Sequence, residues 1–355
     1  MQFAVAIGFV LTTATMSVGS TPMYVRGVEL YPDANPYHSP EALRALSRLL
    51  VDVPETQWVQ FRFFFDQESM TSSTISDGDR QLDAIRSLTR RARQGGREVS
   101  WIVHLLVDGG RAWAALVAPE DRSQWFRSYG RLMQGYARVA QHENVSLLTI
   151  FNEYTSLLEE TSSWRRIIRE IRSVYRGWIA VKLNSWWDLR DWHRILSSDW
   201  LADVDVIGLA PYFDLVNKPR ATLAEMRRGW RASRHGHDIV YQLATISRRF
   251  GKPIVFLEVG YRSIEGAAIE PWNSAARVPA DTGRPVQDLR EQATAAQSVF
   301  DIFCDHASWW RGSVWFYWPT AVTTPPDDRG WAILGKPVVQ TIRNGFQIRC
   351  SEEVG

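Results

Sequence analysis

Two glutamates in this 355-residue sequence each follow a short apolar run directly. Glu153 comes after residues 147–152, and Glu258 comes after residues 254–257. A carboxylate at the carboxyl end of a buried parallel strand faces the mouth of a barrel, where barrel enzymes keep their catalytic groups. Two carboxylates facing one bond can cleave a glycosidic linkage, because one donates a proton to the leaving oxygen while the other attacks the sugar or activates water. The pair therefore predicts acid/base chemistry on a carbohydrate substrate.

Each glutamate also has a purely structural alternative, since a carboxylate at the end of a strand can simply pair with a neighbouring arginine. The positions of Glu153 and Glu258 in the sequence argue against a purely structural role for both glutamates. They lie three strand–helix units apart, so their strands are three apart around a closed ring and the side chains can converge across its mouth.

The elements that must position these glutamates are short apolar runs that alternate with amphipathic segments. We expect strands at 24–31, 58–65, 99–107, 146–151, 179–183, 204–210, 253–259 and 312–318. Eight such strands predict an α/β fold, a single (β/α)8 TIM barrel. The alternative is a doubly wound open sheet, and the absence of Gly-x-Gly-x-x-Gly after the first strand argues against it.

Helices are predicted between these strands, with one long helix or two over residues 223–250. The other predicted helices are 40–50, 79–94, 121–142, 162–175, 190–201, 286–306 and 337–345. Long insertions follow the last two strands, at 264–285 with Trp272 and at 319–336 with Trp331. Barrel active sites are built from these loops, so both insertions are expected to border the site.

Other polar residues at strand positions have predicted roles around the two glutamates. Asn152 can donate a hydrogen bond to a sugar 2-hydroxyl. Tyr212, at the end of the sixth strand, can donate one to Glu258 and help to keep it ionised, or simply pack over the barrel. Arg62, on the second strand, would be costly inside a barrel unless paired, so we expect it to hold a carboxylate such as Glu258. His104, on the third strand, is a further candidate for substrate binding.

Tryptophan is abundant, with 17 residues in the chain. An indole ring offers a flat apolar face on which a pyranose ring can stack. Trp186 and Trp187 end the fifth strand and Trp318 ends the eighth, so each is a candidate floor for a sugar; core packing is the alternative for each. Glu29 and Asp66 end the first two strands, where they bind hydroxyl groups or cap loops.

Residues 256–263, Phe-Leu-Glu-Val-Gly-Tyr-Arg-Ser, resemble the Phe-Thr-Glu-Ile-Gly-Tyr-Arg-Ser of glycoside hydrolase family 113, the endo-β-1,4-mannanases. Residues 184–186, 208–213 and 335–337 are similar to other segments of that family, and the resemblance spans roughly residues 23–345. It implies a retaining clan A mechanism with Glu153 as acid/base and Glu258 as nucleophile, acting on β-1,4-mannan.

The chain departs from the family pattern at two places. Asn152-Glu153 replaces the family's Thr-Glu, and residues 103–108 replace its Lys-Pro-His segment. A clan A hydrolase of another β-glycan therefore remains an alternative. So do a catalytically inactive carbohydrate-binding barrel, which would be expected to lack one glutamate, and a barrel enzyme that uses metal or phosphate chemistry.

Composition excludes several classes of protein. The chain is 45% hydrophobic and 23% charged, which is typical of a soluble globular protein. Its 41 basic and 39 acidic residues give a net charge of +2 without a basic block, so no nucleic-acid partner is expected. The 7 histidines and 2 cysteines show no metal-ligand spacing, so no metal or cofactor is expected. We also expect no membrane span, and a monomer.

The first 20 residues are predicted to be a signal peptide, followed by the barrel domain over residues 21–350. Residues 3–18 carry no charge and are mostly apolar, and Val18 and Ser20 fit a cleavage site before Thr21. This predicts a secreted protein; an N-terminal strand or a clipped tail is the alternative. Cys304 and Cys350 then form one disulfide or remain two thiols.

Overall fold

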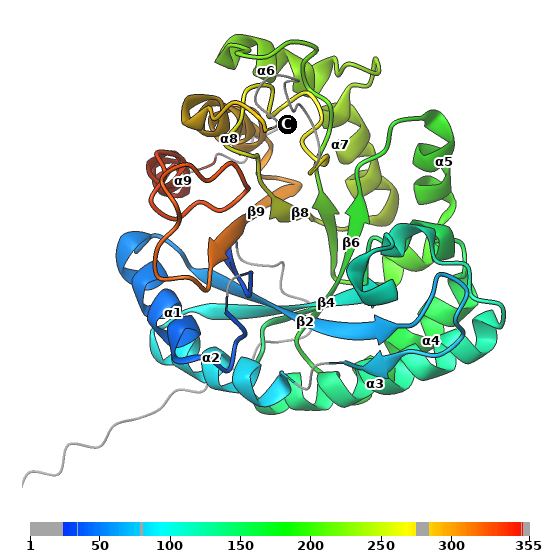
Figure 1. The fold of residues 1–355 in the computed structure, drawn as a ribbon. Coiled ribbons are helices and arrows are strands. Elements are labelled where there is room, and N and C mark those ends of the chain that lie inside the picture. Colours follow the sequence, from blue (N-terminus) through cyan, green and yellow to red (C-terminus); the bar gives the residue numbers. More distant parts are fainter. Residues whose placement is uncertain (1–23, 34, 79–80, 275–283, 349, 351–355) are drawn as a thin grey trace, which may run out of the picture.

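The computed structural model describes residues 24–33, 35–78, 81–274, 284–348 and 350. A nine-stranded sheet has the order β1-β9-β8-β7-β6-β5-β4-β2-β3, and β1 also pairs with β2, so that eight parallel strands close into a ring (Figure 1). The predicted (β/α)8 barrel is therefore confirmed, and the open doubly wound sheet is wrong. The predicted signal peptide, residues 1–20, lies outside the described residues.

The strands of the ring differ from the predicted ones by at most two residues at either end. They are β1 Val25–Tyr31, β2 Trp58–Gln67, β4 Glu98–Val107, β5 Leu147–Asn152, β6 Trp178–Asn184, β7 Val206–Ala210, β8 Ile254–Val259 and β9 Trp310–Pro319. Such strands are recognisable because helices cover one face and the barrel interior the other, so that nearly every position is apolar. The short β3, Ser76–Asp77, pairs antiparallel with β2 outside the ring and was not predicted.

Helices surround the barrel in the order expected from the sequence (Figure 1). They are α1 Pro40–Asp52, α2 Leu82–Gln94, α3 Arg122–His142, α4 Thr161–Arg172, α5 Leu189–Ser197, α6 Leu223–Arg231, α7 Ile239–Phe250, α8 Leu289–Phe303 and α9 Val338–Gln347. Many begin at a side chain that accepts a backbone N–H, such as Ser39 before α1 and Asp238 before α7. The predicted segment 223–250 is two helices, and the loop between them reaches the mouth of the barrel.

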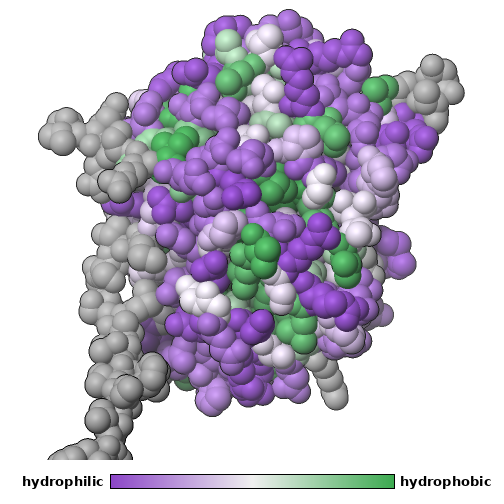
Figure 2. Space-filling model, turned by 90° about the vertical axis from the view of Figure 1, so that its left-hand side faces the viewer, coloured by the Kyte–Doolittle hydropathy of each residue, from purple (hydrophilic) through white to green (hydrophobic). Residues whose placement is uncertain are grey.

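Two apolar layers support the barrel. A small cluster, which includes Trp58, Trp178 and Leu257, fills the interior, with the rings of Trp58 and Trp178 stacked 5.9 Å apart. The larger cluster lies between the strands and the helices. On the face seen in Figure 2 the surface is mostly hydrophilic, and hydrophobic side chains form small separate groups. Among the described residues no helix has the length and apolar character needed to cross a membrane.

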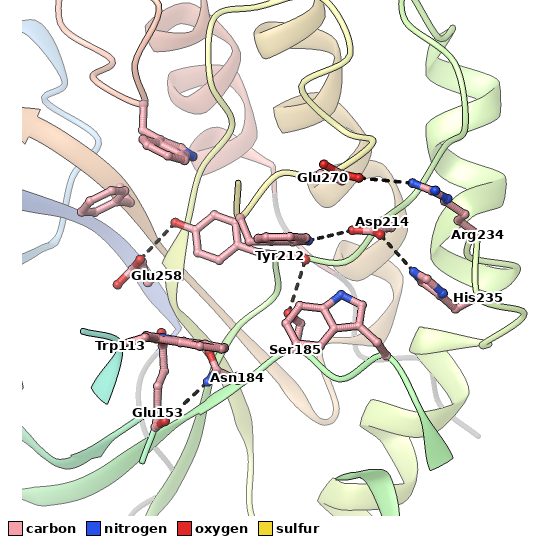
Figure 3. A pocket seen from close by; sticks show the side chains of 14 residues that line it. Trp113, Glu153, Asn184, Ser185, Tyr212, Asp214, Arg234, His235, Glu258 and Glu270 are labelled. Atoms are coloured by element: carbon pink, nitrogen blue, oxygen red, sulfur yellow. Dashed lines mark hydrogen bonds and ion pairs between the residues drawn. The ribbon is translucent and has the colours of Figure 1, made fainter. Parts of the chain in front are cut away.

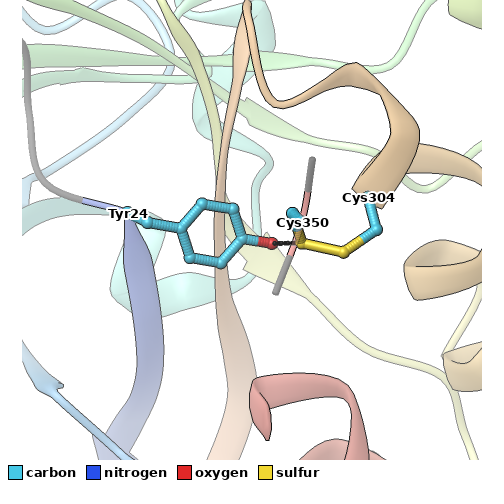
Figure 4. The surroundings of a disulfide bond; sticks show 3 residues. All are labelled: Tyr24, Cys304 and Cys350. Atoms are coloured by element: carbon cyan, nitrogen blue, oxygen red, sulfur yellow. Dashed lines mark hydrogen bonds between the residues drawn. A yellow bond between two sulfur atoms is a disulfide. The ribbon is translucent and has the colours of Figure 1, made fainter. Parts of the chain in front are cut away.

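Cys304 and Cys350 are joined by a disulfide (Figure 4). The bond links the end of α8 to the segment after α9, across 46 residues of sequence. The hydroxyl of Tyr24, next to β1, lies 3.0 Å from the sulfur of Cys350. Of the two alternatives left open by the sequence, a disulfide is therefore correct and a pair of thiols is wrong.

Loss of this disulfide should destabilise the protein without unfolding it. Disulfides typically contribute about 2–4 kcal/mol, and the chain-entropy model puts a loop of 46 residues at the upper end of that range. We expect the double substitution Cys304→Ser/Cys350→Ser to lower the free energy of unfolding in urea by about that amount. A reductant should lower the stability of the original protein and leave the double variant unchanged. Two titratable thiols in unreduced, denatured protein would contradict the prediction.

Candidate active site

Glu153 and Glu258 lie together at the carboxyl ends of the barrel strands, where they line a cavity of about 730 Å³ (Figure 3). Glu258 is the fifth residue of β8, and its side chain is 11% exposed. Glu153 follows β5 directly and has a positive φ of 66°, a conformation that is rare outside glycine. Its N–H donates to the carbonyl of Lys182 on β6 at 2.8 Å. This bond holds the turn that directs Glu153 into the cavity.

One lysine connects the two glutamates. Lys182 Nζ lies 2.8 Å from Glu153 Oε1 and also donates to Glu258 Oε2. The lysine comes from the middle of β6, and its side chain is 1% exposed. An ammonium donates over about 3 Å, so the two carboxylate oxygens that it contacts are less than about 6 Å apart.

Sequence reasoning missed Lys182, although a signal was present. A lysine in an otherwise apolar parallel strand is buried on either face of the sheet, and buried lysines are nearly always paired. The argument that predicts a partner for Arg62 on β2 applies equally to Lys182 on β6.

Arg62 holds Glu258 from the other side, as expected from its place on β2. Its Nη2 donates to Glu258 Oε2 at 2.7 Å, and its Nε donates to Glu29 Oε1, also at 2.7 Å. Gln60 Nε2 donates to the second oxygen of Glu29 at 3.0 Å. Glu29 and Arg62 are both buried, so each charge depends on its partners. Glu29 is thus part of the charged cluster rather than a loop cap.

Three more predicted residues lie beside this cluster. The hydroxyl of Tyr212 donates to Glu258 Oε1 at 3.1 Å, which is the predicted contact (Figure 3). Asn152 Nδ2 donates to the carbonyl of Val103 at 2.6 Å, so one of the two N–H groups of its amide is engaged in the barrel wall. His104 Nδ1 lies 3.3 Å from Arg62 Nη1 and 3.4 Å from Asn152 Nδ2.

These contacts set the protonation states of the cluster. Burial alone would raise the pKa of Glu258, but the charges of Lys182 and Arg62 outweigh it and hold that pKa well below its usual range. Burial alone would lower the pKa of Lys182, but Glu153 and Glu258 outweigh it and raise it. Burial, together with the charges of Arg62 and Lys182, lowers the pKa of His104 to about 3. At neutral pH the cluster therefore holds an ionised Glu258, two cations and a neutral histidine.

Aromatic side chains form much of the cavity wall. Trp187, after β6, and Trp272, in the loop after β8, meet edge to face with ring centroids 5.7 Å apart. Trp113, 48% exposed, contributes from the loop after β4, and Phe316 and Trp331 contribute from β9 and its loop. Both long insertions predicted to border the site therefore do so.

Of the three tryptophans predicted to bind sugar, only Trp187 lines this cavity. Trp186 is buried and donates from Nε1 to Gln242 Oε1 at 2.9 Å, and it borders a smaller neighbouring cavity of about 240 Å³. Trp318 is fully buried in the barrel wall. Trp318 thus has the core-packing role that was its alternative.

A set of polar residues borders the cavity away from the two glutamates. Asp214 accepts from Trp272 Nε1 at 3.1 Å and lies 3.0 Å from His235 Nε2, and Arg234 lies 3.7 Å from Glu270 (Figure 3). Arg234 and His235 belong to the loop between α6 and α7. Sequence analysis did not single them out, because nothing local shows that this loop returns to the barrel mouth. Among the described residues, no group of three or more His, Cys, Asp or Glu side chains could hold a metal ion.

Comparisons with known proteins agree with this geometry. Residues 31–336 match the model of glycoside hydrolase family 113. The fold is similar to that of the family 113 β-mannanase AaManA from Alicyclobacillus acidocaldarius, solved in complex with ManMIm (TM-score 0.75, 21% identity, 92% of this chain and 97% of that chain). A second family 113 β-1,4-mannanase is 18% identical over 92% of this chain and 100% of its own, with the same TM-score of 0.75.

More distant structures share the barrel. A family 5 mannosidase from Rhizomucor miehei has a TM-score of 0.56 at 12% identity, covering 92% of both chains. No curated protein matches the sequence. The family match covers most of the chain and includes both strand-end glutamates. The chain is a glycoside hydrolase and belongs to glycoside hydrolase family 113.

Proposed function

We propose that this protein is a retaining glycoside hydrolase that cleaves β-1,4-mannan, with Glu258 as nucleophile and Glu153 as acid/base. The observation that carries the proposal is the contact of both carboxylates with Lys182 Nζ. Retaining enzymes keep their carboxyl groups about 5–5.5 Å apart, whereas inverting enzymes need about 6.5–9.5 Å to accommodate a water. Two oxygens on one ammonium, less than about 6 Å apart, fit the shorter range.

In the first step, an oxygen of Glu258 attacks the anomeric carbon while the bond to the leaving sugar breaks. Glu153 gives its proton to the leaving oxygen, so that it ends the step as a carboxylate. Glu258 is suited to attack because Arg62 and Lys182 keep it ionised, and Tyr212 fixes its second oxygen. The product of this step is a sugar bound covalently to Glu258.

In the second step, Glu153 removes a proton from water, and the resulting oxygen attacks the anomeric carbon. The bond to Glu258 breaks, and Glu153 is protonated again. Both steps invert the anomeric carbon, so the product keeps the β configuration of the substrate. Nothing besides water is consumed.

Mannan is the proposed substrate because the β-mannanases that share this fold belong to the same family. The tryptophans of the cavity, among them Trp187, Trp272 and Trp331, offer apolar faces suited to the rings of a β-linked chain. Mannose and glucose differ in the orientation of one hydroxyl, and the departures at residues 103–108 lie close to the site. A different β-glycan is therefore the alternative that the substrate test addresses.

We further propose that the protein is secreted, with residues 1–20 as its signal peptide. The disulfide between Cys304 and Cys350 supports this proposal, because such bonds persist in oxidising compartments. N-terminal sequencing of the protein exported by a heterologous host should begin at Thr21. Retention of the intact N-terminus inside the cell would contradict it.

The roles of the two glutamates can be separated with alanine variants and azide. Glu258→Ala should reduce turnover by about 10⁴-fold or more on every substrate, because nothing replaces the nucleophile. Glu153→Ala should lose about 10²–10⁴-fold on mannan and much less on an aryl β-mannoside whose leaving group needs no proton. Azide should restore activity to both variants, since alanine leaves a cavity where each carboxylate stood.

The configuration of the azide product identifies each role. Glu153→Ala should give the β-glycosyl azide, because azide attacks the covalent intermediate. Glu258→Ala should give the α-azide, because azide attacks in place of the nucleophile. The reverse pair of anomers would mean that the roles are exchanged.

A panel of polysaccharides tests the sugar. We expect reducing ends to be released from β-1,4-mannan at least about 10-fold faster than from glucan, xylan or galactan, which corresponds to about 1.4 kcal/mol of discrimination in the transition state. Chromatography of the products gives the chain lengths. Equal or faster cleavage of another glycan would show that mannan is not the preferred substrate, and it would not contradict the two-glutamate mechanism.

A further inference from the structure

We propose that Lys182 is a positioning residue that serves both catalytic glutamates as a shared counterion, staying in contact with the negative charge as it moves between them. The proposal rests on the function proposed above. Its basis is geometric: one buried ammonium contacts Glu153 and Glu258 at the same time.

The two reaction steps move one negative charge back and forth across the site. Before the first step the charge is on Glu258; when Glu258 bonds to the sugar and Glu153 gives up its proton, the charge is on Glu153. The second step returns it. A charge in a low-dielectric site is costly without a partner, so a counterion that contacted only Glu258 would stabilise the start of the first step and oppose its completion. Lys182 contacts both ends of this path.

No other cation of the described residues pairs with Glu153. Arg62 contacts Glu258 and Glu29, and therefore favours the state in which the negative charge is on Glu258.

Among the described residues, the other titratable groups near the cluster are Tyr212, which donates to Glu258, and His104, which is neutral. The ring of Tyr31 packs against the Arg62 guanidinium, the Tyr37 hydroxyl accepts from the Arg62 N–H, and Tyr154 follows Glu153. Burial raises the pKa of each of these three tyrosines, so they stay neutral. The groups of this cluster thus come from β1, β2, β4 and β8 and from the segments that follow β1, β5 and β7, and Lys182 alone contacts both catalytic side chains.

The residue type suits this role. A lysine carries three rotatable donors on a compact charge, so it can bind two carboxylates that lie in different directions. The guanidinium of an arginine is planar and matches a single carboxylate with two parallel bonds. Merely fixing Glu258 would not require Lys182, since Arg62 and Tyr212 already bind both of its oxygens.

The test is the pH dependence of kcat/KM and kcat in Lys182→Met, which removes the charge and keeps the length of the side chain. We expect a rate loss on the order of 100-fold, as for the removal of other preorganised electrostatic partners. Both limbs of the profile should move to higher pH. A carboxyl group that loses a neighbouring ammonium holds its proton more tightly, so the nucleophile ionises later and the acid remains protonated longer.

Two matched variants accompany this measurement. Lys182→Arg keeps a positive charge, so its limbs should stay near those of the original enzyme even if its rate falls. Lys336→Met also replaces a buried lysine, one that contacts Ser263 and Asp328 rather than either glutamate, and its limbs should not move. If Lys182→Met does not fold, judged by circular dichroism, Lys182→Gln gives the same readout, because it donates hydrogen bonds without a charge.

The proposal would be overturned if the pH profile of Lys182→Met, or of Lys182→Gln, had the same acidic and alkaline limbs as that of the original enzyme, whatever its rate. The anomeric configuration of the product, measured on the unsubstituted enzyme, tests the proposed function separately. An inverted product would overturn the retaining mechanism itself. A retained product together with unmoved limbs would overturn the role of Lys182 alone.

Discussion

The active end of this barrel depends on a chain of contacts in which carboxyl groups and buried cations alternate. Glu29 pairs with Arg62, Arg62 with Glu258, Glu258 with Lys182, and Lys182 with Glu153. Desolvation makes an isolated buried charge very unfavourable, and removing one partner of such a pair typically costs about 3–5 kcal/mol. Each cation here lies between two carboxyl groups, so the contacts that make the burial of Arg62, Lys182 and Glu258 possible also fix the positions of the two catalytic candidates.

The rest of the molecule supports this chain. Closure of the ring brings the carboxyl ends of β5, β6 and β8 to the same mouth of the barrel. Glu153 and Glu258, far apart in sequence, can therefore both contact the ammonium of Lys182. Below the charges, the apolar interior around Trp58 and Trp178 excludes water and keeps the strands in register. Above them, the loops after β8 and β9 are joined by Lys336, which donates to Ser263 and to the carbonyl of Gly330, beside Trp331. The cavity wall is thereby anchored to the barrel.

The fold and the central residues could be predicted because their signals are local. Strands buried on both faces are apolar runs, and ionisable residues at their ends stand out, as Glu153, Glu258 and Arg62 did. Loops gave no such signal: His235 reaches the cavity through its contact with Asp214, which lies on a different loop. Trp318 was expected at the sugar site because it ends the eighth strand, whereas its side chain is buried in the barrel wall, beside a shift in the pairing of β1 with β9.

The central claim is that Glu258 becomes covalently bonded to the substrate. A 2-deoxy-2-fluoro β-mannosyl fluoride tests it most directly, because the fluorine at C2 slows both steps while the good leaving group preserves the first, so that the intermediate accumulates. Mass spectrometry of the digested protein should then find one sugar on the peptide that contains Glu258, and none in Glu258→Ala. A sugar attached to Glu153, or no adduct together with an inverted product from mannan, would contradict the account.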